Sequence, residues 1–103
     1  MAKFTMGTWN DGTGTSLQGY VTTTYAFLVE KLGKPLEGDD KVTAEWILKF
    51  EDGTVATIYD YKEYRTPKGV YDWHIGGQFT ESDAEQSAPA RIAEVLGIPT
   101  TEG

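Results

Sequence analysis

The chain has 103 residues, of which 39% are hydrophobic and 24% are charged, and it contains no cysteine. This length fits one domain over residues 1–103 with a single core, and the lack of cysteine excludes disulfides and thiol chemistry. No run approaches the ~18 apolar residues of a membrane span and no signal-peptide pattern is present, so we expect a soluble protein of the cytoplasm. The net charge of −7 argues against sequence-independent binding to duplex nucleic acid, which depends on neutralising phosphates.

Residues 1–14 are expected to be flexible, or to contribute an edge strand near residues 3–8. The segment Asn10–Gly14 has the composition of a loop, because glycine accepts positive φ and Asn or Asp bonds its own backbone. Backbone N–H groups around Gly12, Gly14 and Gly19 could hold a phosphate, but the segment matches no known phosphate-binding fingerprint, and an ordinary loop is preferred. Residues 15–21 are interpreted as extended or looped.

Two helices are predicted from apolar spacing and capping residues. The first covers roughly 23–32, where Tyr25, Leu28, Val29 and Leu32 lie on one face, with threonines 22–24 as N-cap candidates and Gly33 at the end. The second covers about 88–96, because Pro89 is tolerated in a first turn and Gly97 and Pro99 close the element. Residues 98–103 are expected to fray.

Three strands are predicted between the helices, at 42–50, 54–61 and 71–77. The first alternates apolar and polar residues, and Asp52-Gly53 is a strong hairpin signal. Short connections favour an antiparallel meander. The expected fold is therefore α+β, with a small antiparallel sheet of three strands, or slightly more, and two helices packed on it.

The strand at 71–77 places different chemistry on its two faces. Successive strand residues point to opposite sides, so Tyr71, Trp73 and Ile75 are expected in the core. Asp72, His74 and Gly76 share the other face, where a binding site is plausible on chemical grounds. The alternative is a surface histidine bonded to Asp72 or to a carbonyl group.

The loop at 62–70 enters this strand and combines cations with aromatic residues. Lys62, Arg65 and Lys68 could pair with an anion, and Tyr61 and Tyr64 could stack on a base. The competing interpretation is an exposed loop with solvated charges.

An enzyme is a second hypothesis. His74 could act as a base in a phosphodiesterase-like hydrolase, with Ser16 or a threonine as nucleophile and Asp60 or Asp72 as the orienting acid. No nucleophile-elbow motif and no metal-ligand spacing is present. A third hypothesis is an acidic inhibitor of a host protein, based on the acidic segments at 37–40 and 81–85.

Four separated motifs resemble a group of small bacteriophage proteins of undefined role. They lie within residues 13–77 and are TSLQGY (15–20), AEW (44–46), DGTVATIYD (52–60) and YDWHIGG (71–77). The chain from Gln78 onward carries no part of this likeness. The group is in turn similar to the anti-CBASS sponge proteins, which phages make against cyclic-oligonucleotide immune signalling.

This resemblance implies a phage immune-evasion protein that binds without catalysis. It would be a homo-oligomer, a tetramer, that sequesters a cyclic dinucleotide such as 3′,3′-cyclic GMP-AMP in the cytoplasm of a host cell. From the residues themselves we expect no cofactor, no metal and no membrane partner. The resemblance carries no ligand contacts, so we assign them from residue chemistry alone, as hydrogen-bonding, cationic or stacking groups and as glycines that permit close approach. The assigned ligand-binding residues are Ser16, Gln18, Tyr20, Lys62, Arg65, His74, Gly76 and Gly77.

Overall fold

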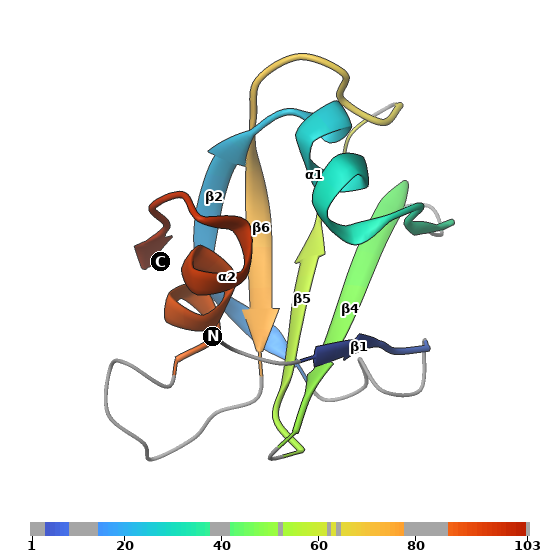
Figure 1. The fold of residues 1–103 in the computed structure, drawn as a ribbon. Coiled ribbons are helices and arrows are strands. Elements are labelled where there is room, and N and C mark those ends of the chain that lie inside the picture. Colours follow the sequence, from blue (N-terminus) through green and yellow to red (C-terminus); the bar gives the residue numbers. More distant parts are fainter. Residues whose placement is uncertain are drawn as a thin grey trace.

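The computed structural model describes residues 4–8, 15–37, 42–51, 53–61, 63, 65–77 and 87–102. Two helices and seven strands lie along these residues (Figure 1). The strands are β1 (Phe4–Met6), β2 (Ser16–Thr23), β3 (Leu36–Glu37), β4 (Ala44–Phe50), β5 (Val55–Tyr59), β6 (Tyr71–Gly77) and β7 (Thr101–Glu102). The helices are α1 (Tyr25–Leu32) and α2 (Ala88–Leu96).

The α+β class is confirmed, but the expected sheet of three strands is too small. The sheet has seven strands in the order β1-β4-β5-β6-β2-β7, and β3 pairs with β4 outside this path. The meander β4-β5-β6 is antiparallel, as predicted, and the other pairings are antiparallel as well. Strands β1, β2 and β7 extend the meander through pairings between segments far apart in the sequence, whereas β3 pairs with the nearby start of β4.

Strand β2 provides the largest extension, although its sequence suggested only an extended or looped segment. It pairs with β6 from Ser16↔Gly77 to Thr23↔Tyr71, with a register shift between Leu17 and Gly19. Such a bulge interrupts the two-residue alternation that identifies a strand from sequence.

The expected fraying of residues 98–103 is not what the structure shows. Thr101 and Glu102 form β7, which pairs with Tyr20 and Gly19 of β2, and the Thr100 hydroxyl donates to the Pro89 carbonyl at 2.8 Å. The close approach of β7 explains Gly19, because a Cβ there would overlap the Thr101 carbonyl oxygen and meet Pro89 Cγ at 2.8 Å. Residue 103 lies outside the described part.

Both helices begin and end where their capping residues predict. Thr24 Oγ1 accepts from the Phe27 N–H at 3.2 Å, and Ser87 Oγ accepts from the Ala90 N–H at 3.3 Å. Gly33 (φ 87°) and Gly97 (φ 73°) end the two helices in backbone conformations that favour glycine. The N-terminal edge strand predicted near residues 3–8 is also present, as β1.

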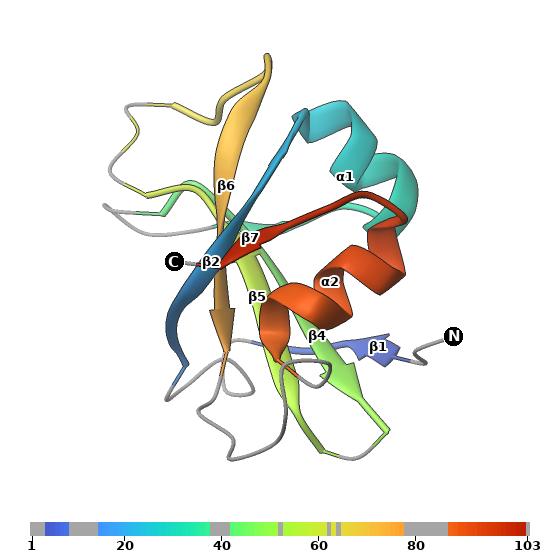
Figure 2. The ribbon, with the colours of Figure 1, turned by 90° about the vertical axis from the view of Figure 1, so that its left-hand side faces the viewer.

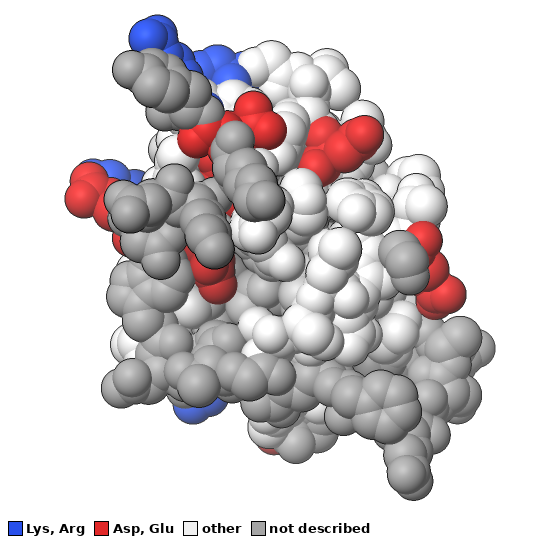
Figure 3. Space-filling model, turned by 180° about the vertical axis from the view of Figure 1, so that it is seen from behind, with Lys and Arg blue, Asp and Glu red and all other residues white. Residues whose placement is uncertain are grey.

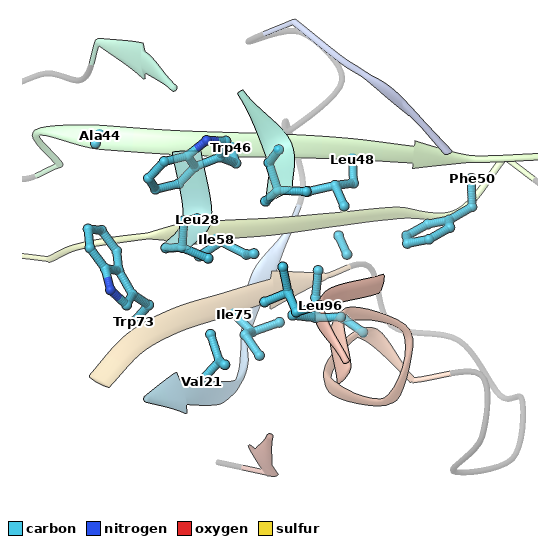
Figure 4. Close-up of a cluster of buried hydrophobic side chains, with 14 residues drawn as sticks. Val21, Leu28, Ala44, Trp46, Leu48, Phe50, Ile58, Trp73, Ile75 and Leu96 are labelled. Carbon is cyan, nitrogen blue, oxygen red and sulfur yellow. The ribbon is translucent and has the colours of Figure 1, made fainter. Parts of the chain in front are cut away.

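The helices cover one face of the sheet (Figure 2). Between them and the sheet lies a core that includes Trp46 and Trp73, of which Trp73 was predicted there; both are fully buried, with ring centroids 5.5 Å apart (Figure 4). Each indole N–H donates to a backbone carbonyl, Trp46 to Gly33 at 2.8 Å and Trp73 to Thr23 at 3.1 Å. These bonds satisfy the buried polar atom of each ring. No helix among the described residues is long and apolar enough to cross a membrane.

Candidate binding site

The face of the sheet opposite the helices carries the polar residues of β6, as the alternation predicted. We call it the outer face. Across it, the register places His74 of β6 between Tyr20 of β2 and Tyr59 of β5, with Glu45 of β4 beside Tyr59. Figure 3 shows this side of the molecule, with uncharged side chains in its middle and acidic side chains along its upper part.

The His74 imidazole is the centre of an aromatic cluster. Its ring centroid lies 5.1 Å from Tyr20 in an edge-on arrangement, 5.4 Å from Tyr59 in a stacked one, and 5.8 Å from Tyr61. These distances are typical of favourable aromatic pairs. We refer to His74, Tyr20, Tyr59 and Tyr61 as the tyrosine–histidine cluster.

Tyr71 departs from the expectation that it belongs wholly to the core. It is half-buried, and its ring lies 5.1 Å from Trp73 on one side and 6.3 Å from His74 on the other. Its hydroxyl accepts from the Tyr61 N–H and donates to Glu63 Oε2, both at 3.3 Å. The physical reason is its place at the start of β6, where Thr23 of β2 pairs with it on one side but β5 no longer does so on the other. Its ring is therefore confined by one neighbouring strand only.

The electrostatic field at this cluster is negative. Burial lowers the pKa of His74, while Asp60, Glu63 and Asp72 act in the opposite direction by favouring the imidazolium. Burial is also the main cause that raises the pKa of Tyr59, followed by the charge of Glu45. Carboxylates therefore surround a half-buried histidine, which favours donors and cations over anions at this point.

Gly76 provides space for the protein's own side chains rather than open space for a ligand. A Cβ at this position would lie 2.5 Å from Thr57 Oγ1 and 3.3 Å from Tyr59 Cε1. Thr57 is fully buried although it lies on the outer face. Thr57 Oγ1 and His74 Nδ1 are both buried and have no hydrogen-bond partner among the described residues. Such atoms are rare in native proteins, because an unpaired buried polar group costs about 1–3 kcal/mol.

The remaining β2 and β6 residues of the predicted site lie apart from this cluster. Gly77 faces α2, where an added Cβ would lie 2.6 Å from the Ala88 Cβ, and Gln18 Nε2 donates to the Gly77 carbonyl at 3.3 Å. Ser16 pairs with Gly77 at the far end of the two strands. The structure therefore brings Tyr20, His74 and Gly76 together and separates them from Gly77 and Gln18.

The predicted basic loop is positioned by a buried carboxylate. Asp60 accepts from the backbone N–H groups of Thr43 at 2.8 Å and Ala44 at 3.1 Å, and from the Thr43 hydroxyl at 2.5 Å. The Thr43 hydroxyl also bonds that of Thr66, at 2.7 Å, which ties the loop to the start of β4. Figure 2 shows part of the 60–70 segment projecting on the side of the sheet away from the helices.

The cations of this loop differ in their surroundings. Arg65 and Lys68 are both exposed, and Lys68 places its ammonium group 3.7 Å from the centre of the Tyr25 ring. Lys62 and Tyr64 lie outside the described residues, as do Gly12 and Gly14 of the suggested phosphate loop. The described residues therefore include Arg65 and Lys68 of the predicted basic loop and Gly19 of the suggested phosphate loop.

The residues suggested for hydrolysis are not assembled around His74. Ser16 pairs with Gly77, which lies three residues beyond His74 on β6. Ser16 is therefore about 10 Å from His74 along the strands, at the usual rise of a strand. Asp60 holds the start of β4, and Asp72 accepts from the Thr22 hydroxyl at 2.5 Å. Within the described part of the chain, no group of three or more acidic or histidine side chains is arranged to hold a metal ion.

Two residues of the outer face, Tyr59 and Thr57, were missed by the sequence analysis. Both lie on β5, opposite His74 and Gly76 of β6. The sequence does contain a signal for this shared face, because strand alternation places positions 57 and 59 on the same side of β5. The missing step was the register between β5 and β6, which the loop joining them does not reveal.

The fold and the candidate site together define an α+β protein with one helix-covered sheet face and one face that carries an aromatic, acidic surface. Comparisons with protein-family models, with curated proteins and with solved structures found no match. The resemblance to the phage sponge proteins therefore stays a prediction.

Proposed function

We propose that the protein is a phage immune-evasion protein that binds a cyclic dinucleotide such as 3′,3′-cyclic GMP-AMP and sequesters it without cleavage, as a homo-oligomer such as a tetramer. The observation that carries the proposal is the tyrosine–histidine cluster on the outer face. Stacking of a base on an aromatic side chain contributes about 1–3 kcal/mol, and every base offers a face for it.

The charges of the site indicate which part of the ligand it takes. A phosphate about 6 Å from one carboxylate is repelled by about 3 kcal/mol at an effective dielectric constant near 20. With Asp60, Glu63 and Asp72 acting on His74, the cluster suits a base rather than a phosphate. The phosphates are better placed toward the loop that carries Arg65, which is exposed.

The absence of an assembled nucleophile and base among the described residues supports binding over turnover. Asp60 is occupied by three hydrogen bonds, and Ser16 lies about 10 Å along the strands from His74. A sequestering protein needs affinity alone, which the cluster can supply.

The test is to incubate the protein with a panel of cyclic dinucleotides, remove the free ligand, denature the protein by heat and identify what is released. Recovery of intact ligand in a fixed ratio to protein is expected. Recovery of a linear product would contradict sequestration and favour the hydrolase. Light scattering before and after ligand loading measures the oligomeric state. A particle that contains one subunit would contradict the proposed homo-oligomer.

A His74→Ala variant tests the position of the site. We expect affinity for the best ligand to fall by about 1–3 kcal/mol, because the stacking surface of the ring is lost. Glu30→Ala, an exposed position on α1, is the matched control and should bind as the unmodified protein does. A change within about twofold for His74→Ala would show that the site lies elsewhere.

The acidic inhibitor of a host protein is a second candidate, favoured by the carboxylates around His74. Its partner would present a basic surface, and its binding would weaken steeply with salt. Failure of every nucleotide to bind, together with such a salt-dependent partner, would replace the sequestration proposal by this one.

A further inference from the structure

Asp72 is an exposed carboxylate at the border of the tyrosine–histidine cluster. It lies two residues before His74 on β6, and therefore on the same outer face. The Thr22 hydroxyl of the neighbouring strand donates to its Oδ1 at 2.5 Å and fixes the orientation of the carboxylate. Its second oxygen, Oδ2, accepts no hydrogen bond from the described residues, so it is available to a ligand.

The spacing between Asp72 and His74 fits a base that stacks on the imidazole. Two residues along a strand span about 6.6 Å, and a hydrogen bond occupies about 2.9 Å of this distance. The remaining length, about 3.7 Å by subtraction, is close to the distance from the middle of a purine to the groups on its pairing edge. A base over His74 can therefore place that edge against Asp72.

The chemistry of a carboxylate discriminates between purines at such an edge. An ionised carboxylate only accepts hydrogen bonds. Guanine presents two neighbouring donors there, N1–H and the N2 amino group, whereas adenine presents an acceptor, N1, beside its amino group. The adenine acceptor would face the carboxylate unpaired, and mismatched polar groups of this kind discriminate strongly.

The same face also holds two polar atoms whose hydrogen-bonding capacity is unused. Thr57 Oγ1 and His74 Nδ1 are buried on the same face, next to Gly76, without a hydrogen-bond partner among the described residues. Because both atoms are buried, the contact that selects the base is assigned to Asp72 rather than to them.

We infer that the outer face selects a guanine-type base, stacked on His74, and that Asp72 Oδ2 is the acceptor that determines this preference. The inference rests on the proposed function and adds the identity of the base. Asp72 acts here through direct contact with the ligand, and Thr22 acts as its positioning residue.

The experiment compares three cyclic dinucleotides that differ only in their bases: 3′,3′-cyclic di-GMP, 3′,3′-cyclic GMP-AMP and 3′,3′-cyclic di-AMP. Calorimetric titration of the unmodified protein should give affinities in that order, with cyclic di-AMP roughly 10- to 100-fold weaker than cyclic di-GMP. Asp72→Asn should weaken the guanine-containing ligands by a similar factor and leave cyclic di-AMP within about threefold, because an amide donates where guanine donates. Glu30→Gln removes the same charge from the helix-covered side and should leave the affinities for all three ligands unchanged.

Equal affinity for cyclic di-AMP and cyclic di-GMP, or an unchanged ratio in Asp72→Asn, would overturn the inference while leaving sequestration intact. Failure of all three ligands to bind would overturn both. Cyclic di-IMP tests the same contact in the unmodified protein, since inosine lacks the N2 amino group. It should bind about tenfold more weakly than cyclic di-GMP, and equal binding would contradict the role of Asp72.

Discussion

His74 links the binding surface to the stability of the fold. Its imidazole is half-buried among tyrosine rings, and burial lowers the pKa of His74 despite the carboxylates nearby. Because the pKa is lower in the folded than in the unfolded chain, the unfolded state takes up a proton first as the pH falls. The contribution of His74 is therefore complete above about pH 6.5 and is lost as the pH falls through its folded pKa.

We predict that the free energy of unfolding decreases between pH 7.5 and pH 5.5 more in the unmodified protein than in His74→Gln. Urea titrations at several pH values measure this difference. Asp and Glu titrate mainly below this window, so they affect both proteins alike. Parallel pH profiles for the two proteins would contradict the lowered pKa.

Gly76 offers a second test of the outer face. In Gly76→Ala the new methyl group meets the buried Thr57 hydroxyl, and we expect a loss of about 1–3 kcal/mol in the free energy of unfolding. In a Thr57→Ala background the obstacle is gone, so the same change should cost clearly less. Chemical denaturation of the four proteins gives the coupling energy, and additive effects would show that the two side chains do not compete for this space.

The sequence predicted the centre of this site but not its neighbours. His74, Tyr20 and Gly76 were selected and do lie together, because alternation along one strand is a local property. Gly77 and Gln18 were selected from the same motifs and lie toward α2, since the bulge after Leu17 changes the alternation of β2. Tyr59 and Thr57 depend on the β5–β6 register, which no local pattern encodes.

A buried carboxylate, that of Asp60, helps to hold the connection between β5 and β6. Asp60 follows β5 directly and, through Thr43 and Thr66, joins the β4 start to the 65–70 segment. We predict that Asp60→Asn lowers the free energy of unfolding by about 2–3 kcal/mol, because the amide cannot accept from all three donors. Amide exchange should accelerate at residues 65–70 more than at β4 or β6. Unchanged exchange in this segment would show that other contacts hold the loop, and Glu30→Gln on α1 serves as the control.

The elements that were predicted correctly share a local signal. Both helices have capping residues at their ends, and β4, β5 and β6 combine periodicity with short connections. The strands β3 and β7 have two residues each, too few to show any period. They exist because longer strands offer them unpaired backbone groups, which is a property of the assembled sheet.

In the whole molecule, β7 pairs with part of the edge of β2 that faces away from β6. Removing residues 100–103 eliminates this pairing and the Thr100–Pro89 hydrogen bond. We predict a loss of about 1–2 kcal/mol in the free energy of unfolding, faster amide exchange at Gly19 and Tyr20, and more self-association through the uncovered edge. Urea titration, hydrogen exchange and sedimentation measure the three effects. A truncated chain as stable as the intact one would show that β7 contributes nothing to the fold.

The place of β2 next to β6 also has a kinetic consequence. The β4-β5-β6 hairpins can form from neighbouring segments, but β2 reaches β6 only by closing a long loop, as in the Thr22–Asp72 pair, whose members are 50 positions apart. Topologies with such distant contacts fold slowly, over milliseconds to seconds. Tyr20 and His74 meet across this same boundary. During synthesis the tyrosine–histidine cluster is therefore absent until β6 has left the ribosome. After dilution from urea, recovery of the proposed ligand binding should follow the slowest refolding phase.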